Sequence, residues 1–174
     1  MRWLPFQLNP DLPEDGIPRE DYVARKFGAR GKGVNERVTM AGRQVGIPFA
    51  YEKMKVQPNT IHAHRLLCYA ERAGKQDELA EELFRAHFTE GANLTDREAL
   101  AGIAARAGLD RKAAADYLAG DTDRDQIARA EVEARSAGIG GVPYFIFNRK
   151  VSVSGAQDPE ALLDAMEQAI ETER

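Results

Sequence analysis

Residues 140–148, GGVPYFIFN, constrain the fold of this chain more than any other segment. They join an Ala-rich helical region to a short apolar run that predicts a strand over residues 144–148. Val142 and Pro143 stand at the junction. Because an X–Pro bond has only a small trans preference, the surrounding structure can hold the Val142–Pro143 bond cis.

The pattern after this junction predicts a β-hairpin followed by a final helix. Residues 148–150 are expected to form a turn, and residues 151–154 a second strand. Gly155, Ala156 and Gln157 then make a tight connection to a helix that Asp158 caps and Pro159 begins. The expected inner face of this helix contains four apolar residues: Leu162, Leu163, Met166 and Ile170.

Upstream of the hairpin, the sequence is mostly helical. Residues 3–8 read as an edge strand or an extended segment, and Pro18 opens the first of several helices that end before Gly residues. Asn59 is expected to cap one helix, and Thr95 to form a capping box with Glu98. The helix around residues 34–46 has a 3.6-residue apolar period that predicts its inner face: Val34, Val38, Ala41 and Val45. The element order predicts an α/β fold with a large helical insertion.

Composition excludes several classes of function. With 24 basic and 28 acidic residues, the chain has a formal charge of −4 and no basic stripe, which argues against a nucleic-acid surface. No apolar run approaches the roughly 18–20 residues that a membrane helix needs. The single cysteine, Cys68, excludes an internal disulfide framework and favours a cytoplasmic location. Cys68 lies mid-helix and is expected to pack in the core rather than react.

The histidines do not predict a metal site. His62 and His64 have an i, i+2 spacing, which points them to different faces of a helix. No acidic or thiol cluster accompanies them. We therefore expect no bound metal and no cofactor.

Four segments carry a family pattern: residues 2–11 (RWLPFQLNPD), 59–67 (NTIHAHRLL), 141–145 (GVPYF) and 153–157 (VSGAQ). Together they resemble the DsbA-like oxidoreductases of the FrnE branch. The resemblance implies a thioredoxin-like α/β fold with a large all-helical insertion, and thiol–disulfide exchange as the activity. Residues 1–17 and 139–174 would form the thioredoxin-like part, and residues 18–138 the helical insertion subdomain.

The resemblance also implies a binding site, with Pro143 cis and the backbone of Val142 open to an extended peptide or to glutathione. Asn9 and Pro10 would lie at its rim, as would the connection formed by Gly155, Ala156 and Gln157. The family's first strand and its Cys-x-x-Cys helix have no counterpart in the sequence. The thioredoxin-like part is therefore expected to be N-terminally incomplete, without catalytic residues of its own and redox-inactive alone.

Two alternatives stay open. The related glutathione-dependent 2-hydroxychromene-2-carboxylate isomerases carry a serine in place of the reactive cysteine, and glutathione would then be the substrate. A non-catalytic thioredoxin-like module would instead use an exposed sheet edge for binding or for homodimerisation. A protein or small-molecule thiol or disulfide is the partner expected under the first interpretation.

Overall fold

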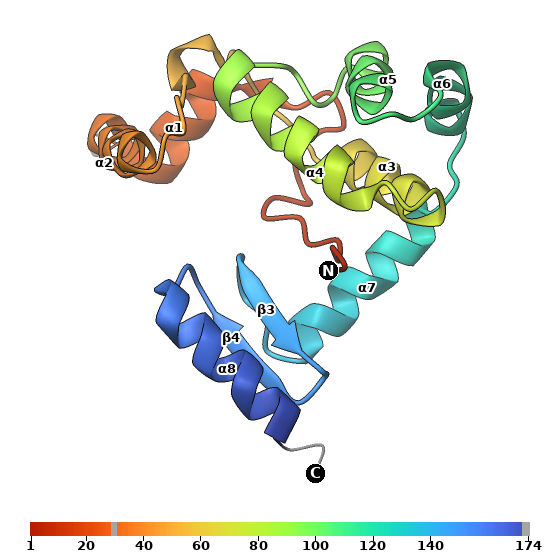
Figure 1. Cartoon of the computed structure of the whole chain (residues 1–174). Coiled ribbons are helices and arrows are strands. Elements are labelled where there is room, and N and C mark those ends of the chain that lie inside the picture. The colour runs from red at the N-terminus through yellow and green to blue at the C-terminus, as the bar shows by residue number, and fades with distance from the viewer. Residues whose placement is uncertain (29–30, 172–174) are drawn as a thin grey trace. The chain divides into compact units, whose positions relative to one another are not determined.

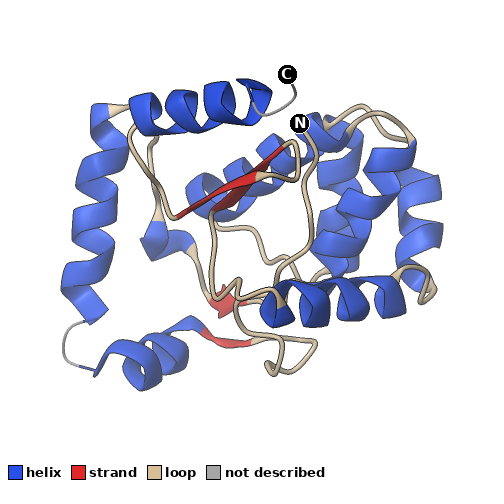
Figure 2. Cartoon of the chain, turned by 90° about the horizontal axis from the view of Figure 1, so that it is seen from below, coloured by secondary structure: helices blue, strands red, loops and turns tan. Residues whose placement is uncertain are grey.

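The computed structural model describes residues 1–28 and 31–171, which fall into two compact units. Unit 1 is Met1–Ala128 and unit 2 is Arg129–Arg174. Helices make up most of unit 1 and about half of unit 2, and the strands are short (Figure 2). Contacts therefore group residues 1–17 with the helical region that follows them, and the predicted grouping of residues 1–17 with 139–174 stays a prediction.

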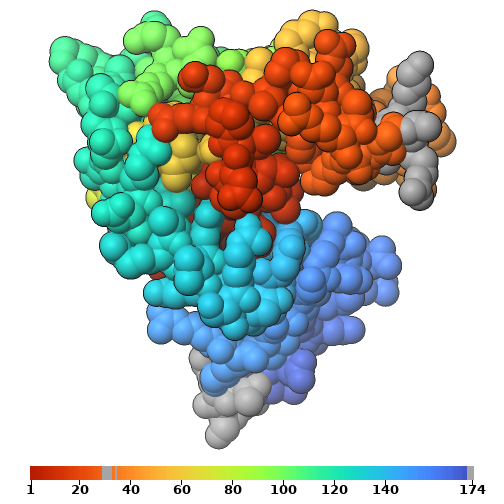
Figure 3. Space-filling view, turned by 180° about the vertical axis from the view of Figure 1, so that it is seen from behind, coloured from red at the N-terminus to blue at the C-terminus, as the bar shows by residue number. Residues whose placement is uncertain are grey.

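Unit 1 begins with an extended segment that lies over the surface of its own helices (Figure 3). Residues 3–8 form no strand, and at Trp3 a side chain takes the place of a neighbouring strand. The amide of Gln76 accepts from the Trp3 N–H at 2.9 Å and donates to the Trp3 carbonyl at 3.1 Å. The Trp3 indole donates to Asp77 at 2.6 Å. The alternative prediction of an extended segment is the one the structure supports.

A short antiparallel pair, β1 (Ile17–Pro18) with β2 (Val56–Gln57), closes the next part of unit 1. Helix α1 (Arg19–Phe27) begins after Pro18 and ends at Gly28, as predicted. Helix α2 (Gly31–Gln44) follows, and a 3-10 turn covers Tyr51–Lys53. A Cβ on Gly42 would lie 2.5 Å from the Phe49 ring, so α2 approaches its neighbour at Gly42.

The main core lies among four helices of unit 1 (Figure 1): α3 (Ile61–Arg72), α4 (Gln76–Arg85), α5 (Arg97–Arg106) and α6 (Arg111–Ala119). A π-helical turn, Ala86–Glu90, extends α4. Leu66, Leu79, Leu100 and Leu118 are fully buried in this core. Such packing of apolar helix faces is the chief source of helix stability in water.

Unit 2 is a hairpin and a helix, preceded by α7 (Arg124–Ser136), which crosses the boundary between the units. Strands β3 (Tyr144–Phe147) and β4 (Val151–Ser154) are antiparallel, with Phe145 opposite Val153 and Phe147 opposite Val151. Helix α8 (Pro159–Glu171) packs against both strands. The predicted hairpin and final helix are confirmed.

The predicted inner faces of two helices are wrong for most of their residues, although Leu162 of α8 is half-buried. On α8, Leu163 and Ile170 are each 57% exposed and Met166 is 46% exposed, whereas Ala165 and Ala169 are buried. Small alanines let the helix approach the hairpin closely, and the large side chains of the adjoining stripe lie outside that contact. On α2, Val38 and Ala41 are exposed, as is Val45 just after it, because the helix packs through Gly42. The side chain of Val34 lies outside the described part.

Two predicted helix caps are displaced by one residue. Thr60, not Asn59, occupies the N-cap of α3, although the Asn59 side chain accepts from the Ile61 N–H at 3.0 Å. Asp96, not Thr95, caps α5 by accepting from the N–H groups of Glu98 and Ala99. No helix in residues 1–28 and 31–171 is both long and apolar enough to cross a membrane.

Candidate functional site

The predicted ligand-facing segment of unit 2 precedes β3. The Val142–Pro143 peptide bond is cis, and the Val142 side chain is 48% exposed. The Gly155 N–H, directly after β4, donates to the Pro143 carbonyl at 2.9 Å. This bond continues the ladder of the hairpin by one step, so the structure brings Pro143 and Gly155 together at one end of the two strands.

The connection between β4 and α8 is held by its own atoms. Gly155 has a φ of +84°, a conformation that favours glycine. The Gln157 amide donates to the Ser154 carbonyl at 2.9 Å, and Ala156 and Gln157 are exposed. These contacts explain the sequence of the turn. Its predicted part in binding a carboxylate stays a prediction.

Asn9 and Pro10 belong to unit 1, where both contact other residues of that unit. The Asn9 side chain accepts from the Tyr22 hydroxyl at 3.3 Å, and the Asn9 carbonyl accepts from the Leu12 N–H at 3.3 Å. The Pro10 carbonyl accepts from the Asn59 amide at 3.4 Å. Pro10 is exposed and Asn9 is half-buried.

Asn59 anchors this loop, a role the sequence did not reveal. Its side-chain nitrogen donates to the Leu12 carbonyl at 2.7 Å, and its oxygen accepts from the Gln7 amide at 2.7 Å. The same oxygen accepts from the Ile61 N–H. Buried Asn59 thus joins the N-terminal segment to the start of α3.

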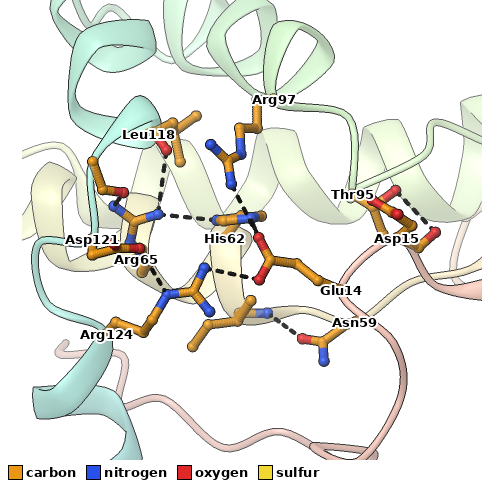
Figure 4. Close-up of polar contacts among 12 residues, drawn as sticks. Glu14, Asp15, Asn59, His62, Arg65, Thr95, Arg97, Leu118, Asp121 and Arg124 are labelled. Carbon is orange, nitrogen blue, oxygen red and sulfur yellow. Dashed lines mark hydrogen bonds and ion pairs between the residues drawn. The ribbon is translucent and has the colours of Figure 1, made fainter.

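A second anchor is a polar cluster around buried Arg65 on α3 (Figure 4). Its guanidinium donates to the carbonyl oxygens that end α6 and lead to α7: Tyr117 at 3.0 Å, Leu118 at 3.4 Å, Gly120, and Thr122 at 2.8 Å. It also contacts His62 Nδ1 at 3.0 Å. Buried charge is costly unless it is hydrogen-bonded, and these contacts meet that need.

Glu14 completes the cluster from the N-terminal segment. Its carboxylate lies 2.7 Å from His62 Nε2 and 3.0 Å from both Arg97 and Arg124 (Figure 4). Partial burial opposes ionisation of Glu14, but the hydrogen bonds from His62, Arg97 and Arg124 prevail and lower its pKa to about 2. Burial, with the charges of Arg97 and Arg65, lowers the pKa of His62, which Glu14 opposes.

Thiol and metal chemistry have no visible site in the described residues. Cys68 is buried in a small cluster with Ile61 and Ile127, and burial together with the charges of Asp123 and Glu71 raises the pKa of its thiol. A raised pKa disfavours the reactive thiolate. Among residues 1–28 and 31–171, no three His, Cys, Asp or Glu side chains gather as metal ligands would.

The hairpin, the final helix and the long helical region define a thioredoxin-like protein with a helical insertion. The chain belongs to the DSBA-like thioredoxin domain family, whose model matches residues 1–167. This places it in a family of thiol–disulfide oxidoreductases. The predicted thioredoxin-like fold with a helical insertion and the predicted DsbA-like family are therefore confirmed, whereas the FrnE branch stays a prediction.

Comparison with solved structures agrees with this family. The chain is similar to the crystal structure of a probable DsbA oxidoreductase from Streptomyces coelicolor, with a TM-score of 0.86 and 27% sequence identity. The similarity covers 95% of this chain and 73% of that chain. Comparison with curated proteins gives no match.

Proposed function

We propose that this chain is the substrate-binding part of a FrnE-type thiol–disulfide oxidoreductase and has no dithiol activity of its own. The match of the family over residues 1–167 carries the proposal. A probable DsbA oxidoreductase, similar over 95% of the chain, supports it. Within unit 2, the binding role falls to Val142 and Pro143, with residues 155–157 beside them. A part for Asn9 and Pro10, which belong to unit 1, stays a prediction from the family resemblance.

The redox prediction follows from the thiol content. Thiol–disulfide exchange at a dithiol needs an attacking thiolate and a second thiol that resolves the mixed disulfide. The sequence contains one cysteine, and its thiol is buried with a raised pKa. We expect no reduction of insulin by this chain in the presence of dithiothreitol above the rate with dithiothreitol alone. Turnover by the chain would contradict the proposal.

The binding prediction is tested by amide chemical shifts. An unfolded peptide with a single cysteine should shift the amides of Val142, Tyr144 and Gly155, because an extended ligand would pair with the backbone there. Amides of α5, in the core of unit 1, are the internal control and should not move. A peptide that leaves the residues around Val142 unchanged would overturn the assignment of the site.

Reduced glutathione separates this proposal from the isomerase-like alternative. Under the oxidoreductase proposal, the peptide should shift the Val142 region at a lower concentration than glutathione does. The reverse order would favour a glutathione-dependent isomerase-like protein.

A further inference from the structure

Helix α8 carries three large apolar side chains that unit 2 leaves uncovered. Leu163, Met166 and Ile170 are exposed, although α8 packs against both strands of the hairpin (Figure 1). Their i, i+3, i+7 spacing places them along one side of the helix. We call these three residues the α8 stripe. Adjoining exposed apolar side chains of this kind are typical of an interaction surface, whereas scattered ones are not.

The α8 stripe also holds apolar side chains that the core of unit 2 lacks. The buried apolar residues described in unit 2 are Ala165 and Ala169, which are small. Leucine, methionine and isoleucine each remove more apolar surface from water than alanine does when they are covered. A partner that covers the stripe therefore stabilises unit 2 in addition to binding it.

The polar border of the α8 stripe is acidic. Glu160 precedes Leu163 by three positions and Glu167 follows it by four, so both lie beside the stripe. Asp164 and Glu171 form the next row, and α8 contains no Lys or Arg. Among the residues that the structure describes, none of these four exposed carboxylates forms an ion pair.

The charge of this border distinguishes between possible occupants. Two copies joined through their α8 helices would bring together four acidic side chains from each copy and no basic one from either helix. Like charges gathered at one interface oppose binding. Helices that lie on membrane surfaces carry Lys and Arg on their polar side, and α8 has neither. A helix with a basic border matches both the spacing of the stripe and its charge.

We propose that the α8 stripe is a docking surface for an amphipathic helix of a separate protein, whose apolar side chains are bordered by Lys and Arg. The apolar side chains of that helix cover the stripe, and its basic side chains pair with Glu160 and Glu167. Because three side chains form only a small contact, the complex is of the weak, transient kind.

Two synthetic helical peptides test this docking surface. They share an apolar stripe with i, i+3, i+7 spacing and differ only in its border, which is Lys and Arg in one peptide and Glu in the other. The basic peptide should shift the amides of α8 and should bind more weakly as salt is added, because the ion pairs are exposed. The acidic peptide should bind at least about tenfold more weakly. Equal affinities, tighter binding of the acidic peptide, or no binding of either would overturn the proposal.

Matched substitutions locate the contact on α8. Leu163→Ala should weaken binding of the basic peptide about fivefold or more, whereas Val132→Ala, at an exposed position of α7, should not weaken it. Glu167→Lys should also weaken binding, by about tenfold. Glu133→Lys, at an exposed position of α7, makes the same change in net charge and should have little effect. Equal effects within either pair would place the contact elsewhere and contradict the proposal.

Two further measurements use the unaltered chain. With the basic peptide bound, the amides of β3, β4 and α8 should exchange more slowly, and those of α5 should not change, because the peptide stabilises unit 2. Unchanged exchange in unit 2 would refute the docking surface. In sedimentation equilibrium without peptide, the chain and Leu163→Ala should have the same molar mass. A dimer that Leu163→Ala weakens would overturn the proposal, because it would assign the α8 stripe to a second copy.

Discussion

Asn59 is the residue whose loss should disturb the N-terminal segment most. Its amide satisfies the Leu12 carbonyl and the Gln7 side chain in a buried position. Since a buried group left without a partner costs about 1–3 kcal/mol, Asn59→Ala should lower the free energy of unfolding by about 2–3 kcal/mol in urea denaturation. Asn9→Ala is the matched control. It removes one long side-chain contact, to Tyr22, and should cost about 0.5 kcal/mol. Equal costs would contradict the anchoring role of Asn59.

Individual residues were predicted well where their role is local and poorly where partners are distant in sequence. Asn59 was recognised as a residue that precedes a helix, but Leu12 and Gln7 lie about fifty positions away and leave no mark in the local pattern. For His62 and Arg65, by contrast, the sequence did contain a pattern that could have predicted a buried polar cluster. They are polar residues spaced i, i+3 on a helix, next to buried Leu66. Polar residues on an apolar helix face indicate a buried hydrogen-bonded cluster.

At the scale of elements, the start of α5 distinguishes two adjacent capping candidates. Asp96 accepts from two free N–H groups of the first turn, and its charge suits the helix N-terminus. Asp96→Ala should therefore reduce the free energy of unfolding by about 1 kcal/mol. Thr95→Ala, which removes the hydroxyl contact with Asn93, should reduce it by less. Urea denaturation of both variants measures these two losses. A larger loss of stability in Thr95→Ala than in Asp96→Ala would support Thr95 as the cap, as the predicted capping box requires.

Helix ends proved easier to predict than helix faces. Gly28, Gly74 and Gly108 follow helices with positive φ values, as the sequence predicted, because this role depends on the glycine itself. A buried face depends also on what the helix meets. Apolar period alone placed Leu163 and Met166 of α8 inside, yet the hairpin contacts the alanines beside them. The alanines and the large apolar residues of α8 together form one broad apolar face. The sequence predicts that face, but it does not indicate which half of the face contacts the hairpin.

For the whole molecule, the order of elements and the family segments were sufficient to predict the fold class. The division into units was not predictable, because it depends on how many contacts each segment makes. Buried apolar side chains described in unit 2 are Ala165 and Ala169, whereas the leucine-rich core belongs to unit 1. A two-stranded hairpin alone is marginally stable, and a helix that contributes two buried alanines adds little apolar area to what is removed from water.

Unit 2 should therefore open more readily than unit 1. In native-state hydrogen exchange, we expect the amides of β3, β4 and α8 to exchange at a lower opening free energy than those of α3 and α5.

Two leucine substitutions locate the core independently. Leu100→Ala removes a fully buried side chain and should cost about 2–5 kcal/mol in urea denaturation. Leu163→Ala, at a 57% exposed position, should cost about 0.5 kcal/mol or less. If Leu163→Ala cost as much as Leu100→Ala, the exposed stripe of α8 would be buried in solution. The amides of α8 would then also exchange slowly in the hydrogen-exchange measurement.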